Sequence, residues 1–121
     1  MIRYAGFDDL IGRMVDEAPD KAALQCAPIG EEGVRTVTWG EFGNLVRTRA
    51  DELSAQACAC EAILADGAVG CVVEVFAAVQ AGLQVVLVDP LMPNDVMMPL
   101  LSAVDADCVW ASNDARREAL E

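Results

Sequence analysis

The stretch from residue 69 to residue 93 limits the possible folds of this sequence more than any other. Residues 69–81 show a helical pattern with apolar side chains nearly all round, which indicates a helix buried on more than one side. Gly82 follows at the position where helices commonly end in a left-handed residue. The next run, Gln84-Val85-Val86-Leu87-Val88, is typical of a parallel strand covered on both faces. A buried helix leading directly into a buried strand predicts an α/β fold.

The same alternation extends from residue 34 onward. Apolar or β-branched runs predict further strands over residues 34–38, 61–65 and 107–111. Helical periodicity predicts further helices over residues 39–57, 94–104 and 113–121. This order predicts a mostly parallel sheet with helices on both faces and right-handed crossovers. No repeat or linker interrupts it, so we expect a single α/β domain over residues 1–121.

The N-terminal part predicts a helix and a hairpin. Apolar residues at helical spacing predict a helix over residues 7–18, which Pro19 ends. Residues 22–27 and 34–38 have the character of strands, and turn-forming residues fill positions 28–33 between them. We therefore expect an N-terminal antiparallel β-hairpin with a long loop.

Two helix starts carry specific expectations. Thr38-Trp39-Gly40-Glu41 has the pattern of a capping box, in which the Thr38 hydroxyl accepts from the Glu41 amide and the Glu41 carboxylate accepts from the Thr38 amide. Asn94 is a candidate cap for the helix after the rigid loop at residues 89–93. Pro99 lacks a backbone donor, so we expect a kink or a late start in that helix.

The charge of the chain excludes several classes of function. Eight Lys and Arg face twenty Asp and Glu, the net charge is -12, and there is no His. A chain this acidic is unsuited to nucleic acid or an anionic membrane surface, so we expect neither as a partner. The absence of His excludes His-based triads and His-containing zinc sites. Acidic residues stand where a signal peptide needs an apolar core, and no apolar run reaches membrane-spanning length, so we expect a cytoplasmic protein.

The cysteines form an odd-numbered set with apolar neighbours: Cys26, Cys58, Cys60, Cys71 and Cys108. A secreted disulfide framework normally uses an even number, so we expect small, buried, free thiols in a reducing compartment. Cys58 and Cys60 form C-x-C rather than C-x-x-C, and without His they predict no metal or redox site.

Few side chains indicate chemistry. The turn at residues 66–70 could place an anion at a helix N-terminus, but it has no nearby cation, so we interpret it as a plain turn. Asp8 and Asp9 are similar to the acidic pair of a phosphoacceptor domain, yet here they open a helix, where carboxylates favour the helix dipole. Asp89 ends a predicted parallel strand, at the edge where open α/β sheets bind ligands. We favour a structural role for Asp89, accepting backbone hydrogen bonds before Pro90.

The remaining candidates are better explained by packing. Three methionines could line a binding groove, but we expect them to fill the core: Met92, Met97 and Met98. We also expect Trp39 and Trp110 to anchor the core. Neither the G-x-x-x-x-G-K-[ST] nor the G-x-G-x-x-G phosphate-binding pattern is present. We therefore assign no catalytic, cofactor-binding or metal-ligating residue.

Three segments nevertheless occur in a distinctive order: Phe7-x-x-Leu10-Ile11 through Ala18-Pro19-Asp20-Lys21-Ala22-Ala23-Leu24, then Val37-Thr38-Trp39-Gly40-Glu41-Phe42, then Phe76-Ala77-Ala78-Val79-Gln80-Ala81-Gly82 through Val88-Asp89-Pro90-Leu91-Met92-Pro93. Through them the chain resembles, along essentially its whole length, the N-terminal region of the AMP-forming acyl-adenylate ligases. This superfamily includes acyl-CoA synthetases, peptide-synthetase adenylation domains and luciferases. The segments are similar to its opening helix with a "P-D-K-x-A-L" strand, its "T-Y-x-E-L" motif and its "L-A-x-x-K-A-G-A-x-x-V-P-L-D-P-x-x-P" motif. The chain departs from the family in a shortened segment at residues 57–62, in Gln80 for a common Lys, and in Pro99.

The resemblance implies a partial N-terminal subdomain of an adenylate-forming enzyme. The parent would use ATP and Mg²⁺ to convert a carboxylate to acyl-AMP and pyrophosphate, and would pass the acyl group to a thiol. In the family the phosphate loop, the nucleotide and acyl segments and the catalytic Lys lie beyond the equivalent of Glu121. The resemblance therefore implies a chain that is inactive alone and whose partner is the remainder of the ligase. A domain cut from a larger fold is also expected to expose an apolar patch or a sheet edge, and can hide it by self-association.

Two other hypotheses stay open at this point. A self-contained module of the same ancestry could bind or scaffold a partner without catalysis. An unrelated α/β domain could bind a small ligand at the strand ends near Ala65 and Asp89.

Overall fold

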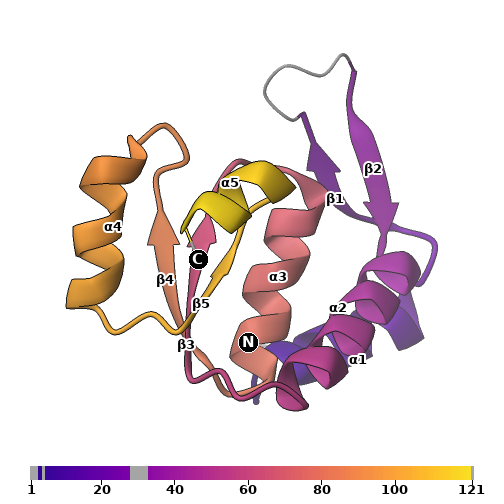
Figure 1. Ribbon diagram of the computed structural model, residues 1–121. Helices are drawn as coiled ribbons and strands as arrows, with labels where there is room; N and C mark the ends of the chain where they lie inside the picture. The colour runs from indigo at the N-terminus through magenta and orange to yellow at the C-terminus, as the bar shows by residue number, and fades with distance from the viewer. Residues whose placement is uncertain (1–2, 4, 28–32, 121) are drawn as a thin grey trace.

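The computed structural model describes residue 3, residues 5–27 and residues 33–120. Within them the chain forms a three-stranded sheet, a separate two-stranded hairpin and surrounding helices (Figure 1). The elements, in chain order, are α1 (Phe7–Glu17), β1 (Ala22–Cys26), β2 (Arg35–Thr38), α2 (Trp39–Ser54), β3 (Cys60–Leu64), α3 (Val69–Gln80), β4 (Gln84–Val88), α4 (Asn94–Ala103), β5 (Cys108–Trp110) and α5 (Asp114–Leu120). They confirm the order and type of the elements expected from the sequence.

The main sheet is parallel, with the strand order β4-β3-β5. Its central strand, β3, is buried at all five positions, and Ile63 pairs with Leu87 on one side and Trp110 on the other. The hairpin of β1 and β2 is antiparallel and forms a sheet of its own. The α/β prediction with an N-terminal hairpin is therefore confirmed. Most of the hairpin loop expected at residues 28–33 lies outside the described residues.

Helices cover both faces of the parallel sheet. The side chains of β3 alternate between the two faces, so each face is apolar and packs against helices. The first core combines Ile63 with α1, α2, α3 and the hairpin; its buried members are Ile11, Cys26, Val37, Phe42, Val46, Ala50, Leu53, Ile63, Val69, Cys71, Val73, Ala77 and Ala78. The second core combines the opposite face of β3 with α4 and α5; its buried members are Ala62, Leu64, Val88, Met97, Leu101, Ala111 and Leu120.

The helix starts agree with the sequence only in part. The Glu41 amide donates to the Thr38 hydroxyl at 3.2 Å, as expected for the cap of α2. The return bond is different, because the Glu41 carboxylate accepts from the Thr38 hydroxyl at 3.3 Å and not from its amide. Thr38 also ends β2, where it lies opposite Ala22 of β1, so the residue serves both the hairpin and the helix start.

The second helix start was predicted wrongly. The cap of α4 is Pro93, and Asn94 is the first helical residue. The helix does not start late, because Pro99 lies inside it, and the alternative of a kink at Pro99 stays a prediction. Pro99 leaves the Asp95 carbonyl without a helical partner, but both residues are exposed, so water can hydrate that carbonyl.

The helix ends follow a common pattern. Gly82 adopts a φ of 84°, its amide donates to the Val79 carbonyl at 3.0 Å, and the next amide, that of Leu83, donates to the Ala78 carbonyl at 2.9 Å. These two bonds form a Schellman motif and confirm the expected role of Gly82. The same pair of bonds ends α4, where Asp105 takes the left-handed position with a φ of 55°.

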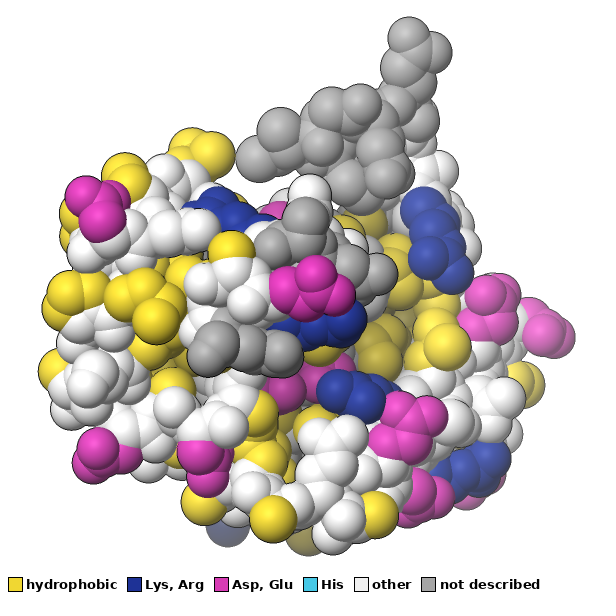
Figure 2. Space-filling model, in the orientation of Figure 1, with side chains coloured by type: hydrophobic (Ala, Val, Ile, Leu, Met, Phe, Trp, Pro, Cys, Tyr) yellow, Lys and Arg dark blue, Asp and Glu magenta, His cyan; other side chains and the backbone are white. Residues whose placement is uncertain are grey.

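Apolar side chains are exposed on and around α4. Figure 2 shows them gathered over this helix on the left of the view. The outer α4 face comprises Leu91, Val96, Met98, Leu100 and Val104, and Leu91 is 80% exposed. The strands β4 and β5 form the two edges of the sheet among the described residues. The expectation of an apolar patch is confirmed.

No helix in the described part of the chain is long and apolar enough to cross a membrane.

Candidate functional site

The carboxyl ends of the parallel strands form the edge at which open α/β sheets usually bind ligands. A cavity of about 170 Å³ lies there, between the ends of the strands and α5. Its lining residues are Leu64, Asp66, Pro90, Ala111, Ser112, Asn113 and Arg116. This is the place where the sequence predicted a small-ligand site, if one existed.

The charged side chains at this edge already have partners within the protein. Asp66 accepts from the Ala68 amide at 3.0 Å and from the Ser112 hydroxyl. Arg116 donates to the Pro90 and Met92 carbonyl oxygens and, through Nε, to the Asn94 side chain at 3.1 Å. These bonds connect the loops after the three strands to one another. The charged side chains at this edge therefore hold the loops together.

Asp89 does not line this cavity. Its carboxylate accepts from the Leu91 amide at 2.9 Å, two residues along the chain. This contact stabilises the turn at Pro90 and confirms the structural role favoured for Asp89.

The acidic pair of α1 also has a structural role. Asp9 accepts from the Ala5 amide at 2.9 Å and from Arg13 Nε at 3.0 Å. These two hydrogen bonds hold the pKa of Asp9 below its usual value. The pair thus lies in the first turn of a helix, as expected.

The large side chains considered as ligand contacts are mostly core residues. Met97 is fully buried, and Met92 packs against the second core. Trp39 and Trp110 pack against the first core. Met98 differs from the prediction, because it is 42% exposed on the outer α4 face.

A buried cluster of charges joins α2, α3 and β3, and the sequence did not predict it. Arg49 Nε lies 2.7 Å from one Glu74 carboxylate oxygen, and Nη2 lies 2.8 Å from the other. Glu74 is 1% exposed in spite of its charge. The hydrogen bonds to Glu74 raise the pKa of Arg49 above its ordinary value. The pair therefore ties α2 to α3 as a two-pronged ion pair.

Glu61 lies behind this pair, on the central strand, and is 2% exposed. Its Oε1 has no hydrogen-bond partner in the described residues. Burial and the neighbouring Glu74 charge raise the pKa of Glu61 to about 8. The environment therefore favours the neutral form of the Glu61 carboxyl, which keeps a second negative charge out of the core.

Two larger hollows lie on the surface near α2. One, of about 470 Å³, is bordered by the Arg49–Glu74 pair and by Trp110. The other, of about 440 Å³, lies between α1 and α2 and has Asp8, Asp16 and Arg47 in its lining. Neither hollow lies at the strand ends, where the sequence placed a possible ligand site.

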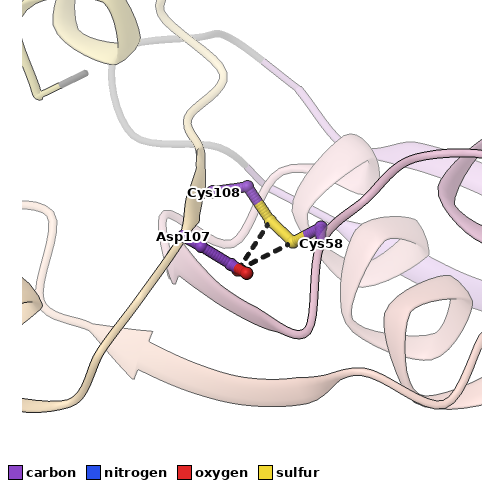
Figure 3. Close-up of side chains that lie close together, drawn as sticks. All are labelled: Cys58, Asp107 and Cys108. Atoms are coloured by element: carbon purple, nitrogen blue, oxygen red, sulfur yellow. Dashed lines mark hydrogen bonds between the residues drawn. A yellow bond between two sulfur atoms is a disulfide. The ribbon is translucent and has the colours of Figure 1, made fainter.

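The cysteines are not all free, which corrects the sequence-based prediction. Cys26, Cys60 and Cys71 are free and buried, as expected. Cys58 and Cys108 are half-buried and joined in a disulfide (Figure 3). The prediction was wrong because the two residues are far apart in the sequence, and only the parallel pairing of β3 with β5 brings them together.

Asp107 completes this group, since its carboxylate and the two sulfurs lie within 4.8 Å of one another. Among the described residues they are the set whose atoms are close enough to hold a metal ion. Two sulfurs and one carboxylate do not suit Mg²⁺, which prefers oxygen ligands. This group of three side chains therefore does not suit the Mg²⁺ of an ATP site.

Comparison with solved structures shows where this fold occurs. The N-terminal subdomain of Klebsiella oxytoca NpsA superimposes with a TM-score of 0.72 and 19% identity, over 93% of this chain and 28% of that one. VinN in complex with 3-methylaspartate gives a TM-score of 0.81 and 19% identity, over 99% of this chain and 33% of that one. The fatty acyl-adenylate ligase from L. pneumophila, in complex with acyl adenylate and pyrophosphate, gives a TM-score of 0.73 and 15% identity, over 86% of this chain and 19% of that one.

These likenesses show the fold, and they are not accompanied by sequence matches. No protein-family model matches the chain, and no curated protein matches it. The chain spans a third or less of the length of each of the three structures. It has the α/β fold of the N-terminal subdomain of adenylate-forming enzymes, as the sequence motifs predicted.

Proposed function

We propose that this chain is the N-terminal structural portion of an ATP-dependent acyl-adenylating ligase, of the acyl-CoA synthetase type. The observation that carries the proposal is the superposition of 86% of the chain on the fatty acyl-adenylate ligase from L. pneumophila. The sequence motifs that resemble the ligase family fall on the same elements.

The roles of the matched residues support the further proposal that the chain is inactive alone. Thr38 caps α2, and Gly82 ends α3. Asp89 stabilises the turn at Pro90. Each of these residues positions backbone, and none is paired with a group that could activate a carboxylate.

The proposal assigns ATP and Mg²⁺ to the parent enzyme and not to this chain. It makes the remainder of the ligase the partner of the chain, in the cytoplasm. The outer α4 face is apolar and uncovered, as expected of a surface that another part of a protein covers. In the absence of that part, two copies of the chain would associate through the same surface.

The test is pyrophosphate exchange into ATP, measured with Mg²⁺ and a panel of fatty, aryl and amino acids. We expect no exchange with the 121-residue chain and exchange with the longer polypeptide of the same reading frame. Exchange by the short chain would show that the chain is not inactive alone. A longer polypeptide that adenylates none of the acids would overturn the proposed activity.

A further inference from the structure

We propose that Cys58 and Cys108 form a site of reversible oxidation. When a small disulfide compound oxidises the two thiols, the resulting cross-link holds β5 and α5 to the sheet. Nothing in the proposed ligase function requires this pair. The site would exchange with low-molecular-weight thiols and disulfides.

The backbone brings the two cysteines together independently of their sulfurs. Cys58 lies just before β3, and Cys108 opens β5, which pairs with β3 through Glu61. Their Cα atoms are 6.2 Å apart, within the range that a disulfide spans. The two thiols therefore meet as soon as the sheet has formed.

Asp107 holds this arrangement in place. Its carboxylate accepts from the Cys60 amide at 3.0 Å and from the Ala59 amide at 3.1 Å, and its own amide donates to the Cys60 carbonyl at 3.0 Å. These bonds hold the pKa of Asp107 below its usual value, so it stays ionised while it grips the loop. Since these hydrogen bonds do not involve sulfur, they keep the two cysteines aligned when the cross-link opens.

The other cysteines do not compete for the pairing. Cys60 is two residues from Cys58, but its thiol points to the Val104 carbonyl at 3.8 Å, on the α4 side of the sheet. Burial and the charges of Asp107 and Asp105 raise the pKa of Cys60, which makes it a poor attacking thiolate. Cys58 and Cys108 are half-buried, so a small reagent reaches them more readily than the buried cysteines.

The segment that the cross-link fastens is the least anchored part of the sheet. β5 has three residues, all half-buried, and it lies at a sheet edge with α5 after it. Figure 3 shows the disulfide joining the start of this strand to the loop before β3. Opening the cross-link therefore loosens β5 and α5 more than the helices of the first core.

The chemistry balances with a small disulfide such as oxidised glutathione. The thiolate of one cysteine attacks it, forms a mixed disulfide and releases one glutathione thiolate. The thiolate of the second cysteine then attacks the first cysteine's sulfur and releases the other glutathione. Two protein thiols lose two protons and two electrons, and one oxidised glutathione becomes two reduced molecules. A dithiol reductant reverses both steps.

The first test maps the cross-link. The 121-residue chain is equilibrated in glutathione buffers of graded ratio, quenched, denatured and alkylated, and the free thiols are located by mass spectrometry. We expect Cys58 and Cys108 to become protected together as the buffer becomes oxidising, while Cys26, Cys60 and Cys71 stay free. Alkylation of both at every ratio, or pairing of either with Cys60, would overturn the proposal.

The second test measures the consequence by hydrogen exchange on the same unmutated chain. We expect amides at positions 108–120 to exchange about ten-fold faster in the reduced chain, while α3 amides keep their rates. Cys58→Ser should match the reduced chain in both buffers, and Cys71→Ser should keep the redox response. Equal exchange in both states would contradict the proposal. So would isolation of the chain with bound zinc that the Cys58→Ser change releases, since the pair would then be a metal site.

Discussion

The two faces of the parallel sheet are covered in different ways. On one face, α3 is itself covered by α2, α1 and the hairpin, so that Phe42 and Val37 lie fully buried in the first core. On the other face, α4 and α5 form a single layer, and outward residues of α4 such as Val96 and Leu100 are apolar and half exposed. The difference is that two layers of elements cover the first face, whereas one layer covers the second and leaves apolar side chains exposed.

The largest expected difference between the faces comes from their apolar side chains. Phe42→Ala removes a buried ring that lies 5.4 Å from the Phe76 ring, so we expect a loss of about 3–5 kcal/mol of unfolding free energy. The matched change on the other face is Leu100→Ala, at a side chain 47% exposed, with an expected change within about 0.5 kcal/mol. Urea unfolding measures both. Equal losses would contradict the comparison.

The Arg49–Glu74 pair should be the next most sensitive point of the first face. Arg49→Met leaves the buried Glu74 carboxylate unpaired, and we expect a loss of about 2–4 kcal/mol, reduced from a fully buried pair because Arg49 is partly exposed. Arg47→Met, on the same helix, removes an exposed contact to Asn44 and should change stability little. Similar unfolding curves for the two variants would show that the ion pair does not hold α2 to α3.

Glu61 should make the stability of the first face depend on pH. The folded chain keeps the Glu61 proton up to a pKa of about 8, whereas the unfolded chain loses it near 4.5. Folding therefore takes up a proton between these values, and the unfolding free energy falls by roughly 1 kcal/mol per pH unit in that window. Above pH 8 the effect is complete.

The change that tests this is Glu61→Gln, which removes the titrating group and keeps the shape of the side chain. We expect a flatter pH profile and a variant more stable than the unmodified chain at pH 8, with the two nearly equal near pH 4.5. Glu52→Gln, at a side chain 56% exposed, is the matched control and should keep the slope. If the unfolding free energy of Glu61→Gln changes with pH as steeply as that of the unmodified chain, another group takes up the proton on folding.

The cap of α2 contributes less. Thr38→Ala removes the hydroxyl that accepts from the Glu41 amide, with an expected loss of about 1 kcal/mol. Thr48→Ala, on the exposed side of the same helix, should be nearly neutral. Thermal unfolding of the two variants side by side separates the cap from the general effect of losing a threonine.

The smallest effect on stability is expected on the outer α4 face, where association should change instead. Val96→Ser combined with Leu100→Ser should alter the unfolding free energy by no more than about 0.5 kcal/mol per site and should lower self-association in sedimentation velocity. Leu45→Ser, at an exposed apolar residue of α2, should leave association unchanged. Loss of self-association in the α2 variant but not in the α4 variant would contradict this prediction, because the copies would then associate through α2.

Local patterns predicted most of the fold. The apolar run of β4 and the glycine after α3 depend on neighbouring residues, and both were predicted correctly. The errors lie where distant residues decide the local structure. Thr38 ends a strand of the hairpin as well as capping α2, and Pro99 is tolerated because its side of α4 faces solvent.

The polar groups of the interior could not be predicted for the same reason. Arg49 and Glu74 lie on different helices, and the packing of α2 on α3 pairs them. Cys58 and Cys108 meet only through the register of β3 and β5. A sequence signal did exist for Glu74, since it was the one charge in the buried helical pattern of residues 69–81.

The most direct test of the account is to read the native coding sequence past the codon for Glu121. We predict that the reading frame continues into a Ser/Thr/Gly-rich phosphate loop, as the resemblance to the ligases implies. A stop codon directly after Glu121 would contradict it, and the hypothesis of a stand-alone binding or scaffold module would replace it.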